Sequence, residues 1–344
     1  MRANDTQMFF MDDIRPAVAT EAPKFIDQLR LTIRRRGLSY ATEKTYVHWA
    51  LRFIRFHRMQ HPEKMGALEV EQFLGDLAER KRCAVATQRL ALNALVFLYS
   101  KHVGIELGKL RFRFARRQRR MPTVFTHTEA TAIIQRLSGT YRTIGALMYG
   151  SGLRVNEVLR LRVKDLDFGS MQITVRDGKG GNERFTLLPR SLIDRLNGQL
   201  TCVEKLHAYD IAQGFGEVYL PDALSRKYPS AARSVEWQFL FPASRVSVDP
   251  LSGVLRRHHR HSSTIQRAVK DAIRACRLRR KASCHTFRHS FATRLIETGY
   301  DIKLVQSLLG HRDIRTTEIY LHVVRNRCES IASPVDEIDM SISK

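Results

Sequence analysis

Cysteine is scarce in this chain, and long apolar segments are absent. Five cysteines among 344 residues are widely spaced and include no CxxC pair, so we expect reduced thiols and no disulfide framework. No apolar run approaches the roughly 18 residues of a membrane-spanning helix. The N-terminal "MRANDTQMFFMDD" turns acidic after a very short apolar stretch, which predicts no export signal. These absences predict a cytoplasmic protein outside the membrane.

Acidic residues are also few relative to basic ones. Lys and Arg total 58 against 34 Asp and Glu, which gives a formal net charge of +24. This excess is larger than solubility requires and predicts a polyanionic partner, most commonly nucleic acid. A membrane surface is the competing partner, but the chain has no basic amphipathic terminus. We therefore expect binding to DNA, with association to the nucleoid.

The length favours two domains. After a tail over residues 1–22, the segment 23–110 has apolar residues at helical spacing and predicts an all-α domain of about four helices. One helix has a buried face opposite Arg52, Arg55 and Arg58. The predicted core positions of this helix are Tyr46, Trp49, Ala50, Phe53 and Ile54. Those of a second helix are Val70, Phe73, Leu74, Leu77 and Ala78, and those of a third helix, after Thr87, are Leu92, Leu95, Val96 and Tyr99.

A basic linker is expected at residues 111–124, where "RFRFARRQRRMP" has six arginines in ten positions. It is either a solvated charge run or a DNA strap, and we favour phosphate contacts by Arg116, Arg117, Arg119 and Arg120. A capping box of Thr126 and Glu129 then opens a second domain at 125–335, followed by a tail at 336–344. This domain is predicted to be helical around one hairpin turning at residues 177–182. The expected fold is mainly α with a small β-sheet.

The segment "CHTFRHSFATRL" contains His285 and His289 at the i, i+4 spacing of zinc-binding helices. Such helices need a Glu after the first His, whereas this chain has Thr286, and Arg288 between the two ligands would repel a cation. We therefore expect no metal and no cofactor. An anion site fits better, because Arg288 and His285 can donate to phosphate oxygens from one helix face. A salt-bridged structural helix remains the alternative for this pair alone.

Three further fragments carry residues suited to phosphate chemistry. Arg154 in "YGSGLRVNE" is expected at a helix start, and Lys179 in "DGKGG" at a hairpin tip. In "LLGHRDIRTTEIY" a helix is expected to end at Gly310, with His311 just beyond it and Tyr320 nine residues later. Each fragment alone is unspecific. The alternative for Tyr320 is an aromatic that packs a C-terminal helix.

Taken together, Arg154, Lys179, His285, Arg288, His311 and Tyr320 resemble in order and spacing the active site of the tyrosine recombinases, the phage integrase family. "ATEKTYVHWALRFIRFH" is similar to the family's N-terminal core-binding domain. The resemblance implies an α+β catalytic domain that clamps DNA with the first domain and acts as a tetramer in synapsis. It implies Tyr320 as nucleophile and a 3′-phosphotyrosine, with Lys179 protonating the 5′ oxygen. Independently, a phosphorane transition state needs cations around its oxygens, which two arginines and a histidine supply without a metal.

The segment at about 215–262 is similar to the added domain of the integron integrases, through "LPDAL", "RKYP", "LFP" and "RRHH". That resemblance implies recombination of gene cassettes between duplex attI and attC, the latter bound as a folded single strand. It also implies contacts to unpaired bases by Trp237, Pro250, His258 and His259, which suits stacking on aromatic surfaces. Alternatively, Trp237 is core and "RRHHRH" is a solvated loop. Competing functions are a phage- or Xer-type recombinase on duplex sites, a type IB topoisomerase, and a non-catalytic DNA-binding protein.

Overall fold

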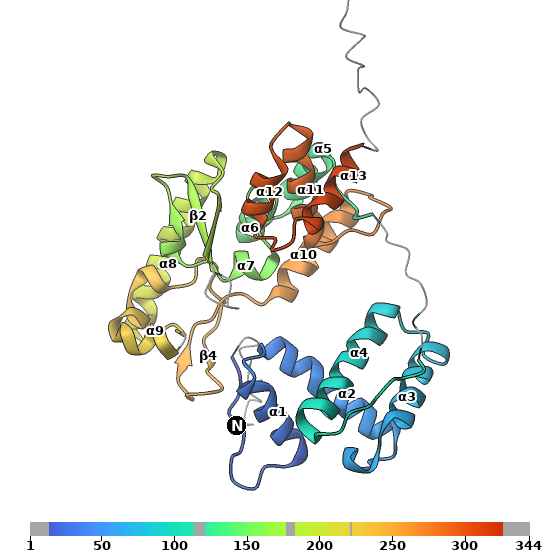
Figure 1. Cartoon of the computed structure of the whole chain (residues 1–344). Coiled ribbons are helices and arrows are strands. Elements are labelled where there is room, and N and C mark those ends of the chain that lie inside the picture. The colour runs from blue at the N-terminus through green and yellow to red at the C-terminus, as the bar shows by residue number, and fades with distance from the viewer. Residues whose placement is uncertain (1–13, 113, 115–120, 177–182, 221, 326–344) are drawn as a thin grey trace, which may run out of the picture. The chain divides into compact units, whose positions relative to one another are not determined.

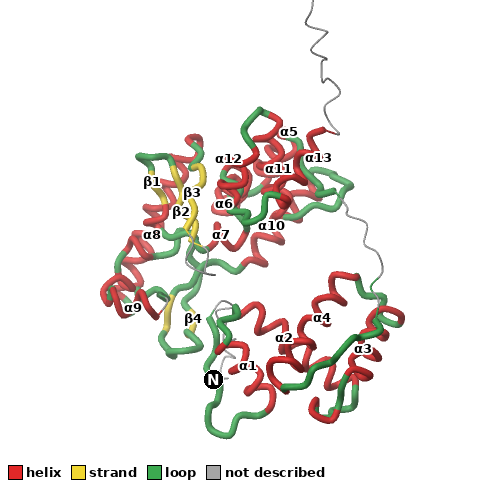
Figure 2. Tube along the Cα trace, viewed as in Figure 1, coloured by secondary structure: helices red, strands yellow, loops and turns green. Residues whose placement is uncertain are grey.

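The computed structural model describes residues 14–325, except for 113, 115–120, 177–182 and 221. The chain divides into two compact units, one of residues 1–119 with 248–254 and the other of the remaining residues. Figure 1 labels the elements, and Figure 2 shows that helices far outnumber strands in the part described. This agrees with the predicted mainly α fold with a small sheet. None of the described helices is long and apolar enough to cross a membrane.

The first unit is built from helices around one apolar core. Ser39 caps the second helix by accepting a hydrogen bond from the Thr42 N–H, and the buried stripe of that helix includes Trp49 and Phe53, as predicted. These side chains pack against Phe73, Leu74 and Leu77 of the next long helix. The elements are α1 (Phe25–Arg35), α2 (Tyr40–Phe56), η1 (Pro62–Lys64), α3 (Ala67–Glu79), α4 (Val85–Phe97) and a π-helical turn, η2 (Leu98–Val103).

Three features of this unit differ from the sequence prediction. Val96 is 41% exposed, because the buried stripe of α4 runs through Ala94 and Leu95 and continues into η2. Ile14 is buried, and Arg34 donates to the carbonyl of Pro16, so residues 14–16 of the expected tail are attached to the unit. The carboxylate of Glu43 is fully buried, and periodicity did not indicate it.

The second unit combines helices with a small sheet. Thr126 and Glu129 form the predicted capping box at the start of the first helix, and Phe287 lies in the core. The helical elements are α5 (His127–Arg136), α6 (Gly139–Gly150), α7 (Val155–Leu159), η3 (Val163–Asp165), η4 (Arg190–Leu192), α8 (Ile193–Ala212), α9 (Asp222–Lys227), η5 (Pro229–Arg233), η6 (Val235–Trp237), α10 (Ser262–Ala275), α11 (Cys284–Glu297), α12 (Ile302–Leu309) and α13 (Arg315–Arg325).

The sheet of this unit is antiparallel, in the order β1-β2-β3. Strands β2 (Gln172–Arg176) and β3 (Glu183–Leu187) are the two arms of the predicted hairpin, and Thr174 pairs with Phe185. The short β1 (Leu166–Asp167), which the sequence did not predict, pairs with β2. Strand β3 lies beside α12, so the β2–β3 pair is attached to the C-terminal helices.

Within residues 215–262, the part belonging to the second unit forms a module with its own apolar cluster. Val218, Leu220, Ala231 and Phe239 are buried in it, with Trp237 packed against them. Main-chain hydrogen bonds join the module to the segment after α7, from Leu240 N–H to the Leu161 carbonyl and from Val163 N–H to the Gln238 carbonyl. The segment also contains the two-stranded pair β4 (Ser247–Val248) and β5 (Leu255–Arg256). Trp237 therefore lies on a framework that is fixed to the second unit.

Candidate active site

A sharp chain reversal places Arg154 at the start of α7. Gly152 adopts the left-handed conformation at φ +64°, and a Cβ built on it would lie 2.4 Å from the Phe291 ring. Only glycine fits this turn without strain. The Gly152 carbonyl in turn accepts a hydrogen bond from Arg288 at 2.7 Å, so the turn before Arg154 is tied to α11.

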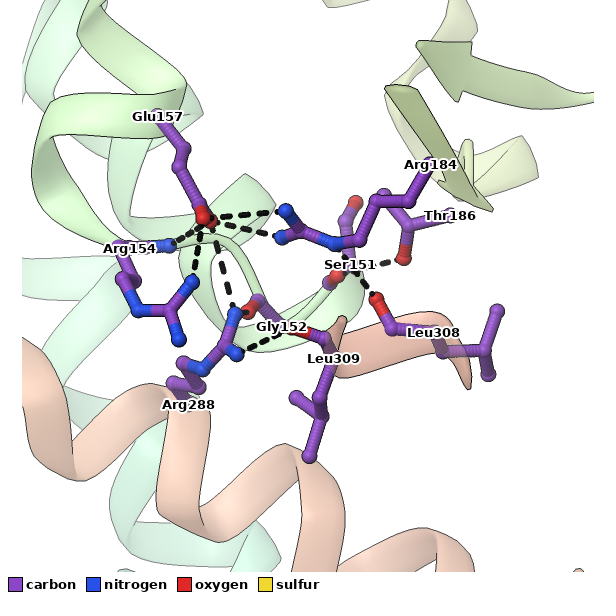
Figure 3. A network of polar contacts seen from close by, with 9 residues as sticks. All are labelled: Ser151, Gly152, Arg154, Glu157, Arg184, Thr186, Arg288, Leu308 and Leu309. Carbon is purple, nitrogen blue, oxygen red and sulfur yellow. Dashed lines mark hydrogen bonds and ion pairs between the residues drawn. The ribbon is translucent and has the colours of Figure 1, made fainter. Parts of the chain in front are cut away.

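One carboxylate, that of Glu157, lies at the centre of three arginines (Figure 3). Arg154 donates from its main-chain N–H at 2.7 Å and from Nη1 at 2.6 Å. Arg184 of β3 forms a two-pronged contact at 3.0 and 2.8 Å, and Arg288 approaches to 3.5 Å. Burial opposes ionisation of Glu157, but these donors lower its pKa to about 2. Three positive charges around one negative charge leave the cluster able to hold an anion.

The three arginines differ in how open they are. The Arg154 side chain is 41% exposed, whereas those of Arg184 and Arg288 are 13% and 4% exposed. Arg288 donates to the carbonyls of Gly152 and Leu309, so the fork that we expected to face a phosphate is bound to the main chain here. Burial lowers its pKa to about 10, and it stays charged at neutral pH. Arg154 is thus the arginine of the cluster that an incoming phosphate meets first.

Helix α12 ends at Gly310 in the left-handed conformation, and His311 follows, as predicted. The His311 ring contacts the Thr317 hydroxyl at 2.9 Å, and Gln306 donates to its main-chain carbonyl. Burial lowers the pKa of His311 to about 4, with further contributions from nearby cations, the largest of them Arg288 and Arg154. His311 is therefore neutral at physiological pH and lies beside the arginine cluster.

Tyr320 on α13 is only 1% exposed, and its hydroxyl contacts Nδ1 of His289 at 2.9 Å. Burial raises the pKa of Tyr320, an effect that Arg288 and then Arg154 oppose. Burial likewise lowers the pKa of His289 to about 4, with His285 and Arg288 adding to it. A neutral imidazole in contact with a phenol can accept its proton, which is the assistance a phenol nucleophile requires.

His285 is exposed at the start of α11. Together with His289 it lines a shallow depression of about 270 Å³, whose other lining residues include Lys281 and Thr286. The ring in contact with the Tyr320 hydroxyl, however, is that of His289. The described candidates Arg154, Arg288, His311 and Tyr320 are close enough that their charges influence one another.

Several predicted site residues cannot be placed. Lys179 lies outside the described residues, and so do Arg116, Arg117, Arg119 and Arg120 of the linker.

In the segment 215–262, Trp237 is half-buried, and Pro250 lies in the turn between β4 and β5. The rings of His258 and His259 lie 4.0 Å apart, each about 5 Å from Phe239. His258 is only 8% exposed, so in the free protein its ring is part of the packing rather than an open surface for a base.

Sequence reasoning missed three residues of the site. Glu157 follows Arg154 by three positions, the spacing of a capping box, so a signal for it was present. His289 was considered only as a metal ligand, although its position one turn after His285 places both on one helix face. Arg184 carried no local signal, because its role depends on β3 lying beside α12, where it donates to the Leu308 carbonyl.

Comparison with known proteins gives family matches over both parts of the chain. The profile described as "Phage integrase family" matches residues 123–327, and "Phage integrase, N-terminal SAM-like domain" matches residues 25–109. An "Integrase/recombinase" of Escherichia coli is 45% identical over 324 residues, covering 94% of this chain and 96% of that protein. Tyrosine recombinase XerA of Pyrococcus furiosus is 27% identical, covering 87% and 89%.

Solved structures share the fold at low sequence identity. XerH recombinase bound to difH substrate superposes with a TM-score of 0.59 at 18% identity, covering 91% of this chain and 86% of that one. A lambda integrase dimer bound to a COC′ core site gives 0.58 at 17%, covering 90% and 97%. The predicted fold class, a helical N-terminal domain followed by a recombinase catalytic domain, is confirmed. The chain belongs to the phage integrase family and is a tyrosine recombinase, an enzyme that cleaves and rejoins DNA.

Proposed function

We propose that this recombinase integrates and excises gene cassettes by strand exchange between attI and attC sites and between two attC sites. The observation that carries the cleavage chemistry is the cluster of Arg154, Arg288 and His311 beside Tyr320. The observation that favours cassette recombination is the module within residues 215–262, which presents Trp237 on a small core of its own. This segment is also the part of the chain that resembles integron integrases.

In the proposed reaction, the Tyr320 oxygen attacks a phosphorus of the DNA backbone, and a histidine accepts the phenol proton. The bond to the 5′ oxygen breaks, and Lys179 supplies the proton that converts this oxygen to a hydroxyl. The product is a 3′-phosphotyrosine, which conserves the phosphodiester energy. A 5′ hydroxyl of the partner strand then attacks this bond and releases Tyr320, so no nucleotide cofactor is consumed.

We assign the charge of the phosphorane transition state to Arg154, Arg288, His285 and His311, with no divalent metal. Hydrogen-bond donors fixed in advance around the equatorial oxygens, two of them charged arginines, serve the purpose that paired metals serve elsewhere. Cleavage should therefore survive an excess of EDTA. The assignment would be contradicted if EDTA abolished cleavage and added magnesium or zinc restored it. The comparison requires that the chelator leave the thermal unfolding of the protein unchanged.

The proposed DNA partners are a duplex attI site and an attC strand folded into an imperfect hairpin. Unpaired bases of that hairpin would stack on Trp237, with Pro250, His258 and His259 confining them. His258 would have to leave its packed position against Phe239 to take part. We further propose a tetramer in synapsis within the cytoplasm, in line with the lambda integrase tetramer bound to a Holliday junction, which has the same fold.

The cleavage proposal is tested by incubating the protein with a labelled attC hairpin and resolving covalent adducts on a denaturing gel. The wild type should form an adduct, and Tyr320→Phe should bind the hairpin normally but form none, because only the hydroxyl is lost. An adduct that persists in Tyr320→Phe would show that another tyrosine is the nucleophile. Arg154→Ala should bind nearly as well, but its cleavage barrier should rise by about 3 kcal/mol, the cost of losing one oxyanion donor.

The cassette proposal is tested by the ratio of affinities for a folded attC strand and for duplex core-site DNA. Trp237→Ala should lower this ratio about 10-fold or more, because base stacking contributes roughly 1 to 3 kcal/mol. Trp237→Phe retains an aromatic surface and should recover most of it. Tyr209→Ala, which removes an exposed aromatic of α8, is the matched control. An unchanged ratio in a folded Trp237→Ala protein would leave a recombinase that acts on duplex sites.

A further inference from the structure

A lysine outside the predicted active site lies directly on the indole of Trp237. The Lys164 ammonium nitrogen is 2.9 Å from the centroid of that ring. Lys164 belongs to η3, and Trp237 closes η6; the hydrogen bond from Val163 N–H to the Gln238 carbonyl holds the two turns together. In the free protein, therefore, an ammonium occupies the surface on which we expect a base to stack.

The Trp237 platform itself is held by a different cation. Arg162 donates from one terminal nitrogen to the Trp237 carbonyl and from the other to the Tyr219 carbonyl at 2.9 Å. Its guanidinium also lies 5.6 Å from the Trp237 ring and 4.6 Å from that of Phe239. Because main-chain carbonyls accept hydrogen bonds from both terminal nitrogens of this guanidinium, Arg162 holds Trp237 in place. A neighbouring cation on a flexible side chain can move.

Lys164 is that neighbour, and its surroundings disfavour its charge. Partial burial, with the positive charges of Arg176 and Arg162, lowers the pKa of Lys164 to about 8. Arg176 is itself paired with Asp165, the residue next to Lys164 in η3. The contact with the ring contributes modestly, whereas an incoming phosphate would stabilise this crowded ammonium directly.

We propose that Trp237 and Lys164 form a single nucleotide site, in which an unpaired base takes the place of the ammonium on the indole and Lys164 moves to the backbone phosphate of the same nucleotide. The inference rests on the proposed recognition of a folded single strand. It assigns Lys164 a specificity-determining contact, because the lysine gains a phosphate only where a nucleotide is outside the helix. The four-carbon lysine stem allows this exchange without movement of η3.

The salt dependence of hairpin affinity measures the proposed contact of Lys164 with a phosphate. Each phosphate bound by a cation adds about 0.7 to 0.9 to the slope of log affinity against log salt concentration. The two substrates are an attC hairpin with one unpaired base and the same hairpin with that base deleted. The wild type should show a steeper slope, by about 0.7, on the first hairpin. Lys164→Gln should lose this difference between the substrates, and Lys164→Arg should keep it. Lys205→Gln, which removes an exposed lysine of α8, should behave as the wild type.

The outcomes separate this inference from the proposed function. If Trp237→Ala lowers the preference for the unpaired base but Lys164→Gln keeps the wild-type difference in slope, the lysine contact is wrong and the proposed function stands. An equal loss of slope on both hairpins would make Lys164 a general phosphate contact and overturn the inference. If Trp237→Ala leaves the preference unchanged, the recognition proposal fails, and the Lys164 site fails with it. Thermal unfolding of Lys164→Gln at the wild-type temperature shows that the platform is intact.

Discussion

At the scale of single residues, the arrangement of Tyr320 and His289 suits proton transfer but not attack on DNA as it stands. The phenol is almost fully buried and contacts a neutral imidazole. The cations that favour the phenolate, Arg288 and Arg154, are close enough to oppose the effect of burial on its pKa. A phosphate that joins the cluster must therefore also gain access to the tyrosine oxygen.

His289 should matter to the rate of cleavage and little to DNA binding. His289→Gln removes the imidazole that contacts the phenol, and general-base assistance contributes about 10²- to 10⁴-fold. We expect single-turnover adduct formation to slow by about 100-fold, with the dissociation constant changed by less than about threefold, below 1 kcal/mol. The control His48→Gln alters an exposed histidine of α2, outside the site. A His289→Gln enzyme that cleaves at the wild-type rate would exclude His289 as the proton acceptor.

Acid should destabilise the catalytic unit through His289 and His311. Their pKa values are about 4 in the folded protein against 6.5 for a free histidine, so the unfolded chain binds more protons between these limits. Their contribution is complete above pH 6.5 and is lost as the pH falls toward 4. Thermal melts between pH 7.5 and 4.5 should show a falling unfolding temperature. The fall in unfolding temperature with pH should be shallower in the double variant His289→Asn/His311→Asn than in the wild type. An equal fall in the two proteins would contradict the assignment of the acid effect to these histidines.

At the scale of elements, the local patterns predicted structure well and side-chain partners poorly. The stripe of α2 and the capping box of α5 depend on neighbours within one or two turns, and both appear as predicted. Glu43 lies on that same α2, but it is buried because Arg34 of α1 pairs with it at 2.9 Å. Arg184 likewise acquires its partners only when β3 packs beside α12. Periodicity carries no information about such contacts between distant segments.

The turn before α7 should be intolerant of any side chain. Gly152→Ala places a methyl group 2.4 Å from Phe291 and 3.1 Å from Leu309, at a left-handed φ that alanine adopts with strain. Strain and overpacking together should lower the free energy of unfolding by about 2 to 4 kcal/mol. Urea denaturation measures this change. Gly198→Ala is the control, because that glycine of α8 has open space around its Cβ position, and a Gly152→Ala protein of wild-type stability would contradict the reasoning.

At the scale of the whole molecule, charge and chain order predicted the partner and most of the proposed site. The charge of +24 indicated a polyanion, and six residues in the order of the tyrosine recombinase active site indicated the family. The sequence could not show that Arg288 is bound by main-chain carbonyls or that Lys164 covers Trp237. Both facts depend on turns brought together by the tertiary fold. Order along the chain predicts candidate site residues, whereas their state in the free protein depends on packing.

The positive charge of the molecule should act on all DNA alike, whereas the module within 215–262 should discriminate. Arg116, Arg117, Arg119 and Arg120 of the linker are predicted phosphate contacts, so replacing all four by Gln should reduce the salt slope of duplex binding by up to about 3.6. Hairpin binding should weaken in parallel, because phosphates are common to both substrates. The ratio of hairpin to duplex affinity should therefore stay at the wild-type value, in contrast to Trp237→Ala. Titrations of both substrates at several salt concentrations measure slope and ratio together. An unchanged slope would make the linker a solvated charge run, and a changed ratio would assign it a part in recognising the hairpin.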